Sequence, residues 1–222
     1  MVHDKKILEY YEEVYRGNTR ELRNNLNRIG KLFKRFPVAE GDKVLDLGCG
    51  FGTVMQYFTR SGARPVGIDI SHEAAKIASQ GGKSTALQAN AEVLPFAARS
   101  FDKAVFVGTL EHFPDPVRSI KEVVRVLKPN AYVCFIVPNS RFPLFRYMGG
   151  TGQIYEVPRT YTEWGDMFTR QGFVIETTYR DPGPGFFDRG IAGLPKKLIL
   201  MLFNLLPVQF TYQFVYVCRK KQ

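Results

Sequence analysis

The apolar positions near the start of the chain follow the period of an α-helix. In residues 19–36, large apolar side chains recur at intervals of three or four and so share one face of the predicted helix. These side chains are Leu22, Leu26, Ile29, Phe33 and Phe36. Residues 5–16 carry a similar pattern. The sequence therefore predicts two helices, and the second ends where Pro37 interrupts the pattern.

From residue 43 to residue 139, short apolar runs alternate with amphipathic segments. The apolar runs are typical of buried strands, and the segments between them are typical of helices. The predicted strands span 43–48, 65–70, 84–90, 101–110 and 131–139. The predicted helices span 51–62, 71–82 and 115–129. Repeated strand–helix units predict a doubly wound α/β fold, with a mostly parallel sheet covered on both faces.

After residue 139 the regular alternation ends. Residues 140–158 are aromatic and contain glycine, and residues 181–193 are rich in proline and glycine. The elements predicted here are a helix over 161–172, strands over 173–180 and 211–220, and an apolar helix over 194–207. Long connections inside a compact domain are usually functional. We therefore expect the segments 140–158 and 181–210 to form a lid over a substrate, although 194–207 could equally be a buried helix.

Composition limits the class of protein. The 222 residues are 45 % hydrophobic and 23 % charged, which is typical of one globular domain. No apolar run reaches the roughly 20 residues of a membrane-spanning helix, and the N-terminus lacks the apolar core of a signal peptide. Cys49, Cys134 and Cys218 form no CxxC pair, so we expect neither disulfides nor a zinc site. These features predict a cytoplasmic protein.

The net charge of +10 lies on the flanks of the chain. Residues 118–222 hold fifteen Lys and Arg against seven Asp and Glu, whereas residues 37–117 hold seven against nine. Basic flanks can attract RNA, an anionic membrane or an anionic small molecule. They can also be ordinary solvated surface. Charge alone therefore leaves the partner open.

The stretch VLDLGCGFG, residues 44–52, joins a predicted strand to a predicted helix through three glycines. Such a turn lets a ligand approach the backbone and the free N–H groups of the helix, although it can also serve only as a tight turn. Asp46 precedes the glycines and suits a cationic amino group better than a pyrophosphate. Asp69 ends the next strand, where a carboxylate can accept hydrogen bonds from a ribose diol. A nucleoside with an amino-acid tail, S-adenosylmethionine (SAM), has both groups.

Five motifs in this order resemble the class I SAM-dependent methyltransferases, especially the branch of the ubiquinone- and menaquinone-biosynthesis enzymes (methyltransferase domain type 11). They are LDLGCGFG (45–52), GIDIS (67–71), NAEVLPFAARSFD (90–102), GTLEHFPDP (108–116) and EVVRVLKPNA (122–131). The resemblance implies a Rossmann-like sheet of seven strands, mostly parallel, with the last strand antiparallel. It also implies one domain, with an N-terminal helical cap (1–39), a SAM-binding core (40–140) and a substrate-side lid with the C-terminal strands (141–222).

The resemblance implies SAM as cofactor and S-adenosyl-L-homocysteine (SAH) as product. The cofactor-binding residues that it implies are Asp46, Gly48, Cys49, Gly50, Gly52, Asp69, Ile70, Asn90, Ala91, Glu92, Gly108 and Tyr11. Asn90 stands where the family usually has an aspartate, so it can accept from the adenine amino group only without charge. Tyr10 is expected beside Tyr11, over the cofactor or in plain helix packing. No metal is expected.

Methyl transfer from a sulfonium needs alignment of donor and acceptor, and it needs a general base only when the acceptor must lose a proton. Glu111 and His112 are the catalytic candidates. His112 could deprotonate a phenol, enol or other hydroxyl group, or it could pack at the rim of the pocket. Tyr155, Tyr161 and Trp164 are expected to wall the acceptor pocket.

Residues 140–210 are aromatic and apolar in character. This composition predicts a small apolar or lipid-like methyl acceptor, methylated on oxygen or carbon. It also predicts peripheral membrane contact through Lys196 and Lys197. An RNA methyltransferase that uses the basic flanks is one alternative, although no Asn-Pro-Pro-Tyr motif for base amino groups is present. A SAM-binding protein without catalysis is the other.

Overall fold

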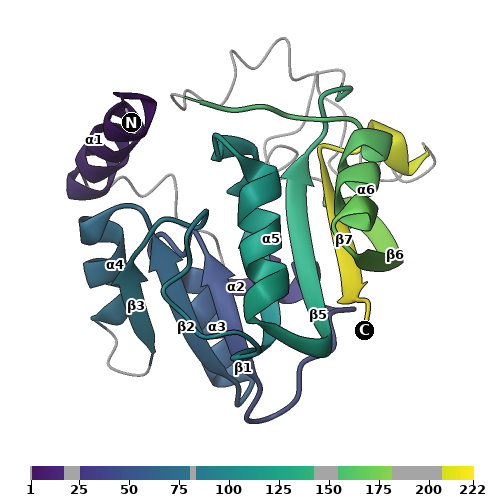
Figure 1. Cartoon of the computed structure of the whole chain (residues 1–222), viewed down its shortest axis with the longest axis horizontal. Helices are drawn as coiled ribbons and strands as arrows, with labels where there is room; N and C mark the ends of the chain where they lie inside the picture. The colour runs from purple at the N-terminus through teal and green to yellow at the C-terminus, as the bar shows by residue number, and fades with distance from the viewer. Residues whose placement is uncertain (1, 18–25, 81–83, 143–154, 182–206) are drawn as a thin grey trace, which may run out of the picture.

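The computed structural model contains a twisted seven-stranded sheet with helices on both faces (Figure 1). It describes residues 2–17, 26–80, 84–142, 155–181 and 207–222. The predicted helix 194–207 and most of the predicted lid, with Phe145, Phe186 and Lys196 among them, lie outside the described residues. No described helix has the length and apolar character needed to cross a membrane.

The sheet has the order β3-β2-β1-β4-β5-β7-β6. Its strands are β1 (Lys43–Leu47), β2 (Arg64–Asp69), β3 (Thr85–Gln88), β4 (Phe101–Val107), β5 (Leu127–Pro138), β6 (Phe173–Asp181) and β7 (Gln213–Lys220). The first five strands pair in parallel, and β7 inserts antiparallel between β5 and β6. The predicted fold class, including the antiparallel last strand, is confirmed.

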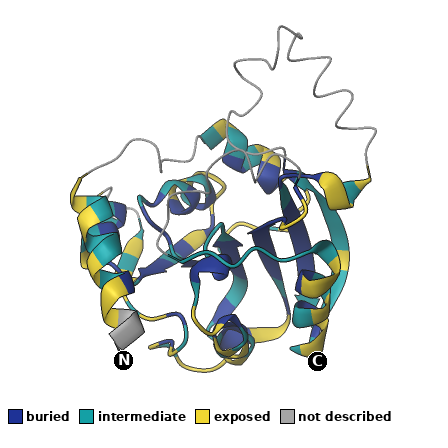
Figure 2. Cartoon of the chain, turned by 90° about the horizontal axis from the view of Figure 1, so that it is seen from above, coloured by how far each residue is buried: buried dark blue, intermediate teal, exposed yellow. Residues whose placement is uncertain are grey.

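Helices cover the sheet in two layers. They are α1 (Val2–Arg16), α2 (Leu26–Leu32), α3 (Thr53–Arg60), α4 (His72–Ser79), α5 (Pro116–Val126) and α6 (Tyr161–Arg170), with short 3-10 turns η2 (Leu110–His112) and η4 (Val208–Phe210). Side chains of α5 and α6 pack on one face of the sheet, and those of α2 and α3 pack on the other. Strand β5 serves both layers because its side chains alternate, with Phe135 in the first core and Cys134 in the second. Figure 2 shows buried residues along the central strands of the sheet.

Helix α5 ends at Val126, so the prediction of a helix to residue 129 is wrong at its C-terminus. Leu127 is already extended, and a residue before proline, here Lys128, is disfavoured in the helical region. Asn130 then takes a positive φ of 59°. The register of β5 against β4 shifts there, because Phe101 pairs with Leu127 but Lys103 pairs with Tyr132. Asparagine suits this position because it tolerates a positive φ.

Two smaller features concern a helix cap and the cysteines. Ser71 caps α4, since its hydroxyl accepts a hydrogen bond from the backbone N–H of Ala74 at 3.1 Å. Cys49, Cys134 and Cys218 are buried and free. Burial raises the pKa of Cys134 well above its usual value, so this thiol behaves as a core residue.

Candidate functional site

The glycine loop between β1 and α3 has a backbone that only glycine adopts easily. Gly48, Gly50 and Gly52 have φ angles of 74°, 50° and 74°. A Cβ on Gly48 would lie 2.5 Å from Cγ2 of Thr109, and one on Gly52 would lie 3.0 Å from Cα of Ala78. Gly48 and Gly52 therefore serve close packing within the protein. The tight-turn role is therefore present in this loop.

Asp69 holds this loop in place. Its carboxylate accepts hydrogen bonds from the backbone N–H of Gly50 at 2.9 Å and of Ser71 at 3.0 Å. Each carboxylate oxygen can accept a further hydrogen bond, so the expected contact with a ribose diol stays compatible with this role. The structure thus gives Asp69 a structural function that the sequence did not predict.

Asp46 supplies a buried carboxyl group without a counter-charge. Its side chain is 1 % exposed, and Oδ2 has no hydrogen-bond partner among the described residues. Burial raises the pKa of Asp46 to about 8, and the nearby carboxylate of Asp69 adds to this. Burial also raises the pKa of Asp69, to about 6, although the two backbone N–H groups act in the opposite direction. A ligand with positive charge would stabilise both carboxylates, and the ammonium and sulfonium groups of SAM fit this requirement.

Helix α1 carries two tyrosines across the glycine loop. The Tyr15 hydroxyl lies 2.9 Å from the position that a Cβ on Gly50 would occupy. The Tyr15 ring packs edge-on against Phe51 at 5.1 Å and on Tyr11 at 6.5 Å, and Tyr11 in turn lies 6.4 Å from the ring of His112. Burial raises the pKa of both tyrosines, so they stay neutral. Tyr11 therefore lies near His112, and its contact with the cofactor stays a prediction, whereas Tyr15 was not singled out from the sequence.

Other predicted residues line the edges of this site. Tyr10 packs edge-on against Tyr11 at 5.2 Å. The side chain of Cys49 packs in a small core with Met55 and Ala78, which leaves only its backbone for a ligand. Ile70 is half-buried after β2, where its carbonyl accepts a hydrogen bond from Gln88 at 3.1 Å.

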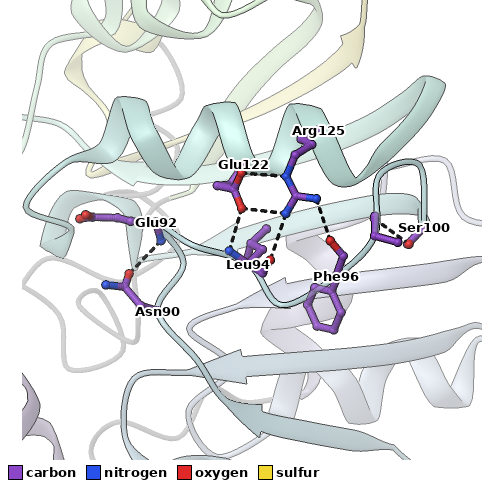
Figure 3. Close-up of polar contacts among 8 residues, drawn as sticks. Asn90, Glu92, Leu94, Phe96, Ser100, Glu122 and Arg125 are labelled. Atoms are coloured by element: carbon purple, nitrogen blue, oxygen red, sulfur yellow. Dashed lines mark hydrogen bonds and ion pairs between the residues drawn. The ribbon is translucent and has the colours of Figure 1, made fainter.

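The loop that follows β3 contains the residues expected at the adenine. Oδ1 of Asn90 accepts from the backbone N–H of Glu92 at 2.8 Å, and Ala91 is buried in the core (Figure 3). Oε1 of Glu92 accepts from the backbone N–H of Asp115 at 2.9 Å. The side chains of Asn90 and Glu92 therefore already hold the loop. Each keeps acceptor capacity for a ligand.

Two charged side chains of α5, Glu122 and Arg125, hold the same loop through hydrogen bonds to its backbone (Figure 3). Glu122 accepts from the backbone N–H of Leu94 at 2.8 Å. Arg125 donates to the carbonyls of Leu94 at 3.0 Å and Phe96 at 2.7 Å, and it also pairs with Glu122. Arginine suits this task because its fork of donors can bind several acceptors at once. Both residues fall in the motif EVVRVLKPNA, but the sequence does not show what they touch.

We expect Arg125→Ala to raise the KM for SAM about tenfold while kcat stays within about twofold, because the loss of roughly two hydrogen bonds loosens only the adenine side. Steady-state kinetics with varied SAM measure this split. Arg125→Lys should restore the KM only in part, since lysine cannot hold both carbonyls in one plane. Arg118→Ala, on an exposed position of the same helix, is the control. An equal fall in kcat would contradict this role.

The catalytic candidates lie on η2, directly after β4. Nδ1 of His112 is hydrogen-bonded to the carbonyl oxygen of Tyr155. A carbonyl only accepts, so Nδ1 carries the proton and Nε2 keeps its lone pair. Burial lowers the pKa of His112, which keeps the ring neutral. The predicted general base is therefore in the tautomer that a base needs.

Glu111 lies next to this base. Its side chain is 3 % exposed, Oε2 has no partner among the described residues, and Oε1 lies 3.8 Å from Nε2 of His112. Burial raises the pKa of Glu111 to about 8, and the charge of Glu156 adds to this. The sequence did not indicate Glu156, because it lies 45 residues further along the chain. Its segment contacts η2 through the hydrogen bond from Val157 N–H to the Glu111 carbonyl at 2.9 Å.

Two of the expected pocket-wall residues belong to the core instead. Trp164 is fully buried and donates Nε1–H to the carbonyl of Pro138 at 2.9 Å. Tyr161 stacks on Tyr216 with ring centroids 5.5 Å apart. The prediction is wrong for Trp164 because α6 turns its apolar face to the sheet. Tyr155 reaches the site through its backbone carbonyl.

The buried acids make the stability of the SAM-free protein pH-dependent. Asp46 and Glu111 have pKa values of about 8 in the folded state, whereas unfolded carboxyls titrate near pH 4. Between these values the folded state binds more protons, so the free energy of unfolding falls as the pH rises, by about 1.4 kcal/mol per unit for each group. We expect the melting temperature to fall from about pH 5 to about pH 8, and Asp46→Asn to reduce that fall. The exposed Asp166→Asn is the control, and an unchanged slope in Asp46→Asn would contradict the assignment.

Part of the chain is similar to known proteins. Residues 45–135 match the model of a methyltransferase domain. A ubiquinone biosynthesis O-methyltransferase of Hahella chejuensis is 33 % identical over 132 residues, which is 56 % of this chain and 56 % of that protein. The uncharacterized protein MJ1252 of Methanocaldococcus jannaschii is 38 % identical over 135 residues, or 60 % of this chain and 52 % of that protein. The chain thus spans about half the length of the curated relatives it matches.

Solved structures agree on the fold. A complex between the Haloferax volcanii Trm112 methyltransferase activator and a methyltransferase contains a chain that matches with a TM-score of 0.75 at 18 % identity, over 96 % of this chain and 98 % of that chain. A SAM-dependent methyltransferase from Methanosarcina mazei matches with a TM-score of 0.65 at 24 % identity, over 83 % and 94 %. Over residues 45–135 the chain is thus similar to methyltransferase domains, and its relatives include a ubiquinone biosynthesis O-methyltransferase. A methyltransferase domain of this fold implies SAM as the cofactor.

Proposed function

We propose that this protein transfers the methyl group of SAM to a hydroxyl oxygen of a small acceptor, with His112 as the general base. The observation that carries this proposal is the neutral imidazole of His112, fixed by the Tyr155 carbonyl, with Nε2 free of that bond. A hydroxyl acceptor must lose its proton during transfer, and a buried neutral histidine can take it. This choice favours oxygen over carbon among the two atoms expected from the sequence.

The residues that would hold SAM are those of the glycine loop, with Asp46 for the ammonium group, Asp69 for the ribose and the loop from Asn90 for the adenine. SAM, when bound, supplies a methyl group on a cationic sulfur. A bond would form between the acceptor oxygen and the methyl carbon while the carbon–sulfur bond breaks with its electrons going to sulfur. SAH would be the leaving group. His112 takes the hydroxyl proton on Nε2. Tyr11 and Tyr15 exclude water from the donor side.

The acceptor is proposed to be an apolar molecule with a ring hydroxyl. Two relatives support this by their names, the ubiquinone biosynthesis O-methyltransferase and a 2-methyl-6-phytyl-1,4-hydroquinone methyltransferase of rice, which is 37 % identical over 90 residues. RNA is less favoured because the acids Asp46, Asp69, Glu111 and Glu156 gather at the site, and none of these groups can neutralise a phosphate. Contact with a membrane surface remains part of the proposal for a lipid-like acceptor.

The test is an incubation with methyl-labelled SAM and a cell extract that is then separated into lipid, small-molecule and RNA fractions. Label should enter the lipid or small-molecule fraction. Label confined to RNA would contradict the acceptor class. Binding of SAM without label in any fraction would instead favour a SAM-binding protein without catalysis.

A further inference from the structure

Gly108, beside the catalytic candidates, lies between a hydrogen-bond donor and a hydrogen-bond acceptor. Gly108 follows β4 with a φ of 65° and carries no side chain. A Cβ on this residue would lie 3.6 Å from Oε1 of Glu111 and 3.9 Å from Nε2 of Gln213, the two nearest described heavy atoms. Because residue 108 is glycine, it places no side chain between these two polar atoms, and, apart from its chain neighbours, no heavy atom of the described residues lies closer to that point.

The orientation of the Gln213 amide is set by a cation. Nη2 of Arg28, on α2, donates to Oε1 of Gln213 at 3.3 Å. A guanidinium only donates, so the oxygen of the amide must face Arg28 and the NH₂ group must face Gly108. Among the described residues, that NH₂ group donates no hydrogen bond.

Arg28 is itself held in place by a buried acid. It pairs with Asp181 at the end of β6, whose side chain is 2 % exposed. The Asp181 carbonyl accepts a hydrogen bond from the hydroxyl of Thr211 at 3.1 Å, just ahead of β7. Three elements that are distant in sequence, α2, β6 and β7, therefore fix one amide. A well-held amide is suited to binding because little side-chain entropy is lost when a ligand arrives.

On the other side of Gly108, the carboxyl group of Glu111 lies between Gly108 and the proposed base, His112. Its Oε1 lies near Gly108 and is 3.8 Å from Nε2 of His112. Its other oxygen, Oε2, is buried and has no partner among the described residues. A buried polar atom without a partner costs about 1–3 kcal/mol, which a hydrogen-bonding ligand would recover. The amide donor of Gln213, the carboxyl group of Glu111 and the base His112 thus lie together at one side of the site.

We infer that Gln213 is an acceptor-binding residue, which donates a hydrogen bond to the acceptor oxygen beside Gly108, while Oε1 of Glu111 accepts a hydrogen bond from that same hydroxyl and His112 takes its proton on transfer. This inference rests on the proposed function. It selects a group that both accepts and donates, because an ether has no proton for Glu111 and a protonated amine has no lone pair for Gln213. The methyl ether that forms satisfies only Gln213, which favours release of the product.

Binding of three probes to the SAH-loaded protein at about pH 7, measured by ¹⁹F NMR, tests this inference. The probes are 4-fluorophenol, which donates and accepts, 4-fluoroanisole, which only accepts, and fluorobenzene, which does neither. The phenol should bind about tenfold more tightly than the anisole, the value of one hydrogen bond to a carboxyl group. Gln213→Leu and Gln213→Glu should each weaken phenol binding about tenfold while the affinity for SAH is unchanged.

Gln213→Glu keeps the size of the side chain and its acceptor for Arg28, so it carries the test if Gln213→Leu does not fold. Gln209→Leu, at an exposed position nearby, is the control and should bind as the wild type does. Equal affinities of the wild type for the three probes, no binding of the phenol, or an undiminished preference for phenol in the Gln213 variants would overturn the inference. No transfer takes place in this experiment, so a failure to label any extract would count against the proposed function alone.

Discussion

His112→Asn is expected to lower kcat at least 100-fold while the affinity for SAM stays within about twofold. The asparagine side-chain N–H₂ can replace Nδ1–H at the Tyr155 carbonyl, so the local structure is kept, but it offers no basic nitrogen at the position of Nε2. Loss of a general base typically costs a factor of 10² to 10⁴. Rates of methyl transfer with the labelled fraction, together with calorimetry of SAM binding, measure both quantities.

The exposed His72→Asn is the matched control and should transfer at the wild-type rate. Because burial lowers the pKa of His112, the wild-type rate should also be nearly constant from about pH 7 to about pH 8. A His112→Asn enzyme with wild-type kcat would show that the imidazole only packs against η2. The transfer would then need no base, as expected for an acceptor without a proton to lose.

Asp69→Ala is expected to abolish measurable SAM binding and to destabilise the SAM-free protein by about 2–4 kcal/mol. The buried N–H groups of Gly50 and Ser71 lose their acceptor, and each costs about 1–3 kcal/mol. The two backbone contacts therefore make Asp69 part of the fold as well as of the proposed site. Denaturant unfolding measures the stability, and calorimetry measures the binding.

Asp102 offers a matched control because it also accepts from a backbone N–H, that of Lys43 at 3.0 Å, but at the N-terminal end of β4 and in a partly exposed position. Asp102→Ala should cost about 1 kcal/mol or less and leave SAM binding unchanged. Unchanged stability of Asp69→Ala would contradict the structural role of Asp69. Unchanged SAM binding in a folded Asp69→Ala would contradict its role at the ribose.

The sheet could be predicted from the sequence because its buried strands are continuous apolar runs and its helices are amphipathic. The glycine loop, Asp46 and the adjacent pair Glu111–His112 were also visible, since each lies in a short contiguous motif. Tyr15 carried a signal that was overlooked, because it lies four residues after Tyr11 on the same helical face.

The rest of the site depends on contacts between distant segments. Arg28, Asp181 and Gln213 come from three separate parts of the chain, and nothing local in any of them indicates a binding role. Glu156 could not be predicted for the same reason, since only the pairing of its segment with η2 brings it near Glu111. Trp164 was misassigned because an aromatic residue on an amphipathic helix looks the same from the sequence whether it faces a pocket or the sheet.

Titration calorimetry of the wild-type protein with SAM and with NADH tests the central claim most directly, that this glycine loop binds a nucleoside with a cationic tail. SAM should bind at one site per chain, and Asp46→Asn should weaken that binding, because the buried carboxylate that pairs with the ammonium group is lost. NADH should not bind, because its pyrophosphate would meet the carboxylates of Asp46 and Asp69. Binding of NADH without binding of SAM would contradict the account.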